Sequence, residues 1–180
     1  DYQKNVAEVT RHDIQLAIDA GLYRTATALG KRLVAAQPEL ASNTTALADA
    51  YAALGPRSPE PLAEEKTDQG KKEARKRLSK LTLQEEERTL AATPAGKELQ
   101  KANYAEAEKL YRRGAELEPN YALAWRGLGE LYEKQSQAQQ SIEAYRKYLE
   151  LQPGAMDRLM ILRRIKALES KTAPTEKTDK

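Results

Sequence analysis

The chain has 180 residues, of which 30 are Lys or Arg and 27 are Asp or Glu, so its formal net charge is +3. It contains no cysteine and one histidine, which excludes a disulfide framework, a cysteine-ligated zinc site and a two-histidine metal site within one chain. No apolar run approaches the roughly 20 residues of a membrane-spanning helix, and the small net charge does not by itself indicate nucleic-acid binding.

The N-terminal part of the chain predicts a first pair of helices over residues 7–40. Ala, Leu, Glu, Lys, Arg and Gln are abundant and Val and Ile are scarce, which favours an all-α fold. Ile14, Ala17 and Ile18 lie at helical spacing, and a second apolar series ends at Pro38, which cannot continue a helix. The chain starts without Met and without a signal peptide, so we interpret it as a mature form or a fragment of a longer protein.

The middle of the chain predicts a second helix pair over 41–87 with an insertion near 56–69, where Pro and polar residues accumulate. One interpretation places the second helix of this pair over 74–81. A competing interpretation starts a helix at Thr82, which begins a Thr-x-x-Glu capping box. Thr93, which Pro follows, either caps a further helical segment or marks a kink.

One basic cluster lies within 71–80, where six Lys and Arg residues surround a single Glu. Such a cluster attracts anionic partners such as nucleic acid or anionic lipid. However, no aromatic residue is interleaved for base stacking, and the acidic run 85–87 follows soon after. We therefore expect no nucleic-acid partner.

The C-terminal half contains an internal repeat of 34 residues. Three positions recur at this one spacing: Tyr111 with Tyr145, Leu117 with Leu151, and Pro119 with Pro153. Self-similarity at such a period is typical of helical repeat proteins. Two regular repeats between Pro38 and Pro119 would leave 13 surplus residues, which the predicted insertion accommodates.

The segment 122–155 resembles a tetratricopeptide repeat (TPR). The resemblance rests on Trp125, Leu128, Gly129, Tyr132, Ser141, Tyr145 and Pro153. Ser141 replaces the usual Ala, and Tyr148 stands where Ala is usual. Gly129 has no side chain and lets the partner helix approach closely, while Pro153 ends the second helix. The match is strongest over 104–155 and weaker over 7–55 and 74–103.

The resemblance implies an all-α solenoid of antiparallel helix pairs within one domain, 1–169. The expected units are 7–40, 41–87, 88–121 and 122–155, followed by a capping helix over 156–169 and a disordered polar tail over 170–180. The third unit is the least regular, because Pro94 and Gly96 fall where its first helix is expected. A capping helix is expected because a solenoid must cover its last apolar face.

The resemblance also implies a concave groove lined by the first helix of each pair. In the clearest repeat the partner-binding candidates are Arg126, Glu130, Glu133 and Lys134, with Leu123 and Gly127 beside them. The counterparts upstream are Arg11, Gln15, Thr45 and Asp49. This set does not reproduce the Lys/Asn carboxylate clamp of chaperone-binding relatives, so that specificity is not carried over. Trp125 is expected to pack between helices rather than to bind a ligand.

No catalytic constellation or cofactor motif is visible. His12 has no partner that would make it a catalytic base, and we expect it on the surface. The leading hypothesis is a non-catalytic module that binds a partner peptide or protein surface. The alternative is an accessory C-terminal domain of a larger bacterial envelope enzyme, such as a zinc metallopeptidase, or of an assembly factor. Self-association is a further possibility, and the compartment, cytoplasm or periplasm, stays open.

Overall fold

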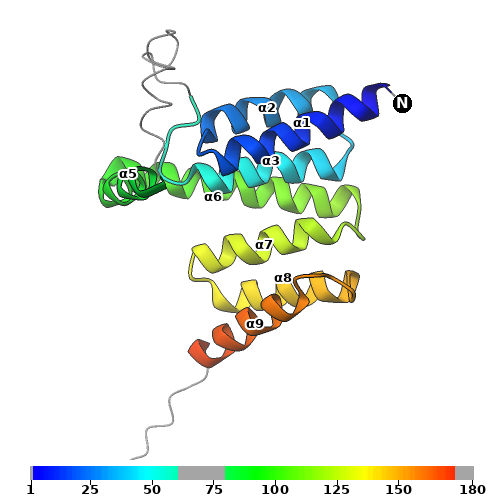
Figure 1. Cartoon of the computed structure of the whole chain (residues 1–180). Helices are drawn as coiled ribbons and strands as arrows, with labels where there is room; N and C mark the ends of the chain where they lie inside the picture. The colour runs from blue at the N-terminus through cyan, green and yellow to red at the C-terminus, as the bar shows by residue number, and fades with distance from the viewer. Residues whose placement is uncertain (1, 61–79, 173–180) are drawn as a thin grey trace, which may run out of the picture.

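The computed structural model describes residues 2–60 and 80–172, and the side chains of 6–60 and 83–172. This part of the chain is helical and contains no strand, as Figure 1 shows. The helices are α1 (Tyr2–Asp19), α2 (Tyr23–Ala36), α3 (Ala41–Leu54), α5 (Lys80–Ala92), α6 (Pro94–Leu117), α7 (Ala122–Lys134), α8 (Ala138–Leu151) and α9 (Arg158–Thr172).

The helices stack in chain order as antiparallel neighbours. Figure 1 shows α1 and α2 at the top, then α3 and α6, then α7 and α8, with α9 at the bottom. The first helix of each pair also contacts the first helix of the next, because α3 packs on both α1 and α7. The predicted all-α solenoid is therefore confirmed.

The pairing in the middle of the chain differs from the predicted division into 41–87 and 88–121. Helix α3 packs most extensively against α6, so these two form one pair, and residues 55–93 lie between its two helices. The 81 residues from Pro38 to Pro119 thus contain one 34-residue repeat and 47 additional residues, rather than two repeats and 13.

The physical reason lies at the start of α6. The side chain of Thr93 accepts a hydrogen bond from the Gly96 amide, and Pro94 occupies the first turn, where its missing N–H is not needed. These residues therefore begin a continuous helix of 24 residues and do not interrupt one. Helix α5 packs on α6, and it has no extensive contact with any other described helix.

A buried arginine fixes the chain where it leaves α3. Arg57 is 3% exposed, and its guanidinium donates to the carbonyl oxygens of Leu54 at 3.3 Å and Leu83 at 3.0 Å. It also lies over the ring of Tyr23, 4.9 Å from the ring centre. The Asn103 amide donates to the carbonyl oxygens of Gly55 and Arg57, both at 2.8 Å. These contacts join α2, α3, α5 and α6.

Tyrosine hydroxyls connect successive elements of the stack. Each is hydrogen-bonded to a carboxylate on a neighbouring element: Tyr111 to Asp49 at 2.6 Å, Tyr132 to Glu108 at 2.8 Å, Tyr145 to Glu133 at 2.8 Å and Tyr148 to Asp157 at 2.7 Å. The rings pack in the core while the hydroxyls reach its polar edge. Tyr148, the departure from the repeat pattern, therefore gains a carboxylate partner on the loop before α9.

Close helix approach depends on glycine, as the sequence predicts. A Cβ atom at Gly129 would overlap the ring of Tyr145 on α8, and the Ser141 hydroxyl donates to the Gly129 carbonyl at 2.8 Å. Trp125 is partly buried and packs against core residues on both sides of α7, in agreement with its expected place between helices.

The C-terminal helix covers the last pair. Ile161, Ile165 and Leu168 of α9 are buried with residues of α8, as expected for a capping helix. This helix continues through residues 170–172, which were predicted to belong to the polar tail, and the rest of that tail lies outside the described residues. The side chain of Thr82 and the basic cluster within 71–80 also lie outside the described side chains.

Candidate functional site

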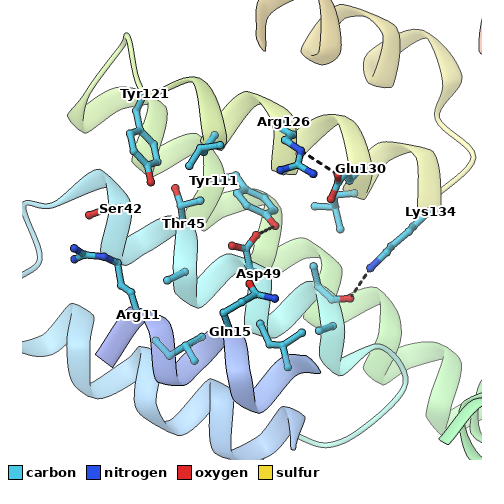
Figure 2. A pocket seen from close by; sticks show the side chains of 18 residues that line it. Arg11, Gln15, Ser42, Thr45, Asp49, Tyr111, Tyr121, Arg126, Glu130 and Lys134 are labelled. Atoms are coloured by element: carbon cyan, nitrogen blue, oxygen red, sulfur yellow. Dashed lines mark hydrogen bonds and ion pairs between the residues drawn. The ribbon is translucent and has the colours of Figure 1, made fainter. Parts of the chain in front are cut away.

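A cavity of about 580 Å³, lined by both polar and apolar side chains, crosses the first helices of all three pairs. Its walls come from α1, α3 and α7, with one side chain from α6, Tyr111, and one from the loop before α7, Tyr121. Figure 2 shows these side chains converging on a common space. We call this cavity the groove.

Most of the sequence-predicted candidates line the groove. Arg126, Glu130 and Lys134 lie on its α7 wall together with Leu123 and Gly127. The upstream counterparts line the other walls: Arg11 and Gln15 come from α1, and Thr45 and Asp49 come from α3. The structure thus brings residues up to 123 positions apart to one surface.

Glu133 is the exception among the four main candidates. Its carboxylate accepts hydrogen bonds from the Tyr145 hydroxyl at 2.8 Å and from Arg164 of α9 at 3.2 Å. It lines a neighbouring hollow of about 340 Å³ with Glu130, Lys134 and Arg164. Its position joins α7 to α8 and α9.

Sequence reasoning missed the two tyrosines of the groove. Tyr111 lies on the second helix of its pair and reaches the groove because Gly127 leaves room: a Cβ there would overlap the tyrosine ring. The sequence signal for Tyr111 is Gly127 itself, because a glycine in a packed helix can leave space for an aromatic ring from a neighbouring helix. Tyr121 precedes α7 and lies outside the helical positions considered.

The charges of the groove are unevenly paired. Arg126 is 3.4 Å from the Glu130 carboxylate and 3.1 Å from that of Asp157, so its charge is compensated. Lys134 instead donates to the Ala52 carbonyl at 3.2 Å, and Arg11 donates to the Asn43 amide oxygen at 2.7 Å. Neither of these two cations forms an ion pair with a carboxylate among the described residues. The groove therefore offers donors at both ends.

Asp49 is the carboxylate on the floor of the groove. It is mostly buried and accepts a hydrogen bond from the Tyr111 hydroxyl at 2.6 Å. Burial raises the pKa of Asp49 to about 6, and the nearby negative charge of Glu130 adds to this, while Tyr111, Arg126 and Lys134 act in the opposite direction. Burial, with the charge of Asp49, also raises the pKa of Tyr111. The pair therefore contains a carboxyl group that keeps its proton to a higher pH than an ordinary aspartate does.

Three other features were searched for in the described part of the chain: a histidine in the groove, a metal site and a membrane-spanning helix. His12 is exposed on α1 and does not line the groove. The described residues contain no group of three or more acidic, His or Cys side chains suited to a metal ion. None of the described helices combines the length and the apolar character that crossing a bilayer requires.

Fold and groove together define the class: a TPR-like helical fold, in which an all-α solenoid of helix pairs presents a concave polar surface made by its first helices. Among solved structures, the chain is similar to one titled "MamA RS-1 ArsTM double mutant", with 17% sequence identity over 92% of this chain and 95% of that one. The TM-score is 0.29, which is too low to carry any property of that protein over to this chain. No family model and no curated protein matches the sequence.

Proposed function

We propose that this chain is a non-catalytic interaction module that binds an extended segment of a partner protein in the groove. The observation that carries the proposal is the continuous cavity formed by α1, α3 and α7, because three separate helix pairs supply its walls. Stacked helix pairs use extended concave surfaces of this kind for binding.

The lining suits an extended polypeptide better than a compact apolar ligand. An extended segment exposes backbone donors and acceptors along its length, and it needs partners of both kinds. Arg11 and Lys134 supply donors at the two ends, while Asp49 and Glu130 supply acceptors between them. These charges therefore provide partners for both kinds of backbone group along the groove.

The experiment compares two tryptophan substitutions at matched glutamines. Gln15 lines the groove, is exposed, and donates to Asp19 four residues further along α1 at 2.9 Å. Gln139 of α8 is also exposed and donates to Glu143 four residues further on at 3.0 Å, but it lies outside the groove. Q15W therefore fills the groove, while Q139W makes the same chemical change elsewhere.

A displayed library of random peptides is selected on the wild-type chain, and enriched peptides are measured by fluorescence anisotropy. We expect Q15W to weaken binding by at least about tenfold and Q139W to leave it unchanged, with equal helical content by circular dichroism. Equal binding to Q15W and wild type would place the peptide site elsewhere and contradict the proposal. Failure to enrich any peptide would also contradict it. The alternative of an accessory domain in a larger envelope enzyme gains no support from the comparisons.

A further inference from the structure

The two ends of the solenoid each expose apolar side chains. On α1, Val9 is 61% and Leu16 is 51% exposed; on α9, Leu159 is 72% and Leu162 is 40% exposed. Helix α3, inside the stack, packs against four other described helices, whereas α1 packs against two and α9 against one. The end helices therefore keep apolar surface that the interior helices bury.

The exposed surface of α1 is acidic. Val9, Asp13 and Leu16 follow the spacing i, i+4, i+7 and form one stripe on the helix. Glu8 lies on the flank of the helix between this stripe and Gln15 of the groove. Asp13 and Glu8 are exposed and form no ion pair with a described residue. Helix α1 contains two cations: Lys4 lies outside the described side chains, and Arg11 is directed to Asn43 instead. We call Glu8, Val9, Asp13 and Leu16 the acidic stripe.

The exposed surface of α9 has the same apolar character and the opposite charge. Leu159, Arg163 and Lys166 repeat the spacing i, i+4, i+7, and Leu162 lies beside them. Arg163 and Lys166 are exposed and form no ion pair with a described residue, while the nearby Glu169 is held by Arg146 at 2.7 Å. We call Leu159, Leu162, Arg163 and Lys166 the basic stripe.

We propose that the chain associates head to tail, with the basic stripe of one copy seated on the acidic stripe of a second copy. The contact continues the stacking of helix pairs from one molecule into the next. Because the two stripes differ, the contact is heterologous and leaves one stripe free at each end, so association is open-ended. Leucine and valine side chains supply the apolar contact, and the opposite charges set its orientation.

The primary measurement is sedimentation velocity of the full chain over a concentration series. We expect the average mass to rise above the monomer mass of 20.1 kDa with concentration, and added salt to reduce it. The charge reversal R163E/K166E should weaken association by at least about tenfold. K97E/K101E changes the net charge equally at exposed residues of α6, outside both stripes, and should associate like wild type.

A mixing experiment tests the head-to-tail geometry itself. R163E/K166E blocks the basic stripe, and V9E/L16E blocks the acidic stripe; all four positions are exposed, so the fold is preserved. Each variant alone should remain monomeric. A mixture of the two should form a 1:1 dimer and nothing larger, because one intact stripe remains on each partner.

Several results would overturn this proposal. A constant monomer mass at every concentration is one, and a mixture that stays monomeric is another. Association of R163E/K166E at wild-type strength would also exclude the basic stripe. If instead the monomer co-sediments with vesicles containing anionic phosphatidylserine and R163E/K166E does not, α9 binds lipid and the proposal is wrong. None of these results bears on the groove, whose lining contains no residue of either stripe.

Discussion

At the scale of single residues, Asp49 and Tyr111 are a pair whose protonation depends on burial. The pKa of Asp49 is raised from 3.8 to about 6, so the folded state binds more protons than the unfolded state between these values. The contribution of Asp49 to stability is therefore largest below about pH 4 and is lost as the pH rises through about 6. Above that pH the charged carboxylate costs the folded state free energy.

Asp49→Asn removes this titration and keeps an amide oxygen that accepts from Tyr111. We expect the free energy of unfolding of the wild type, relative to the variant, to fall by about 1–3 kcal/mol between pH 4 and pH 7. Urea unfolding of both chains at several pH values measures the difference. Parallel curves across this range would contradict the raised pKa.

A second residue-scale prediction concerns the close contact at Gly129. Gly129→Ala places a methyl group where the buried ring of Tyr145 lies, so we expect a loss of about 1–3 kcal/mol or more. Gly154→Ala is the matched control, because a Cβ at Gly154 meets no atom within 4 Å. Thermal unfolding measures the midpoint temperature of each variant. Equal midpoints for Gly129→Ala and Gly154→Ala would contradict the prediction, because they would show that α7 and α8 move apart at little cost.

At the scale of elements, α5 depends on Arg57. Removing its guanidinium takes one donor away from each of the carbonyl groups of Leu54 and Leu83 and deprives Glu86 and Glu87 of a cation 3.6 Å away. We expect Arg57→Ala to lower stability by roughly 2–4 kcal/mol and to speed amide hydrogen exchange in α5. The control Arg113→Ala removes an exposed ion pair with Glu116 and should change stability by less than about 1 kcal/mol.

Hydrogen exchange followed by mass spectrometry resolves the two effects of Arg57→Ala. If α5 amides exchange at the wild-type rate while global stability falls, Arg57 supports only the end of α3. That result would remove α5 from the set of elements that this residue joins.

The sequence predicts where the helices lie better than it predicts which helices pack together. Apolar spacing locates the helices, because each helix must bury one face and the spacing reports that face directly. It does not say which helices pack together. The 34-residue period suggested that a first helix must precede Tyr104, but the Thr93 cap and Pro94 instead extend the second helix backwards, so α3 takes α6 as its partner.

At the scale of the whole molecule, the groove is the property that the sequence anticipates best. The part of its lining that α1, α3 and α7 supply follows from the family resemblance, because the same face of each first helix is directed to one side of the stack. Glu133 shows the limit: one residue before Lys134, it faces α8 and α9, and Tyr145 and Arg164 hold it there. Tyr111 shows a second limit, since a ring from a second helix enters wherever a glycine leaves space.

The position of residues 55–93 has a consequence for the order of folding. The two helices of a terminal pair are joined by a short connection, such as residues 135–137 between α7 and α8, whereas 39 residues separate α3 from α6. Closing the longer connection costs about 2 kcal/mol more in chain entropy. We therefore expect α1–α2 and α7–α8 to form early and the central pair, which has the most extensive interface, to join them last. Pulse-labelling exchange during refolding would show this as late protection of α3.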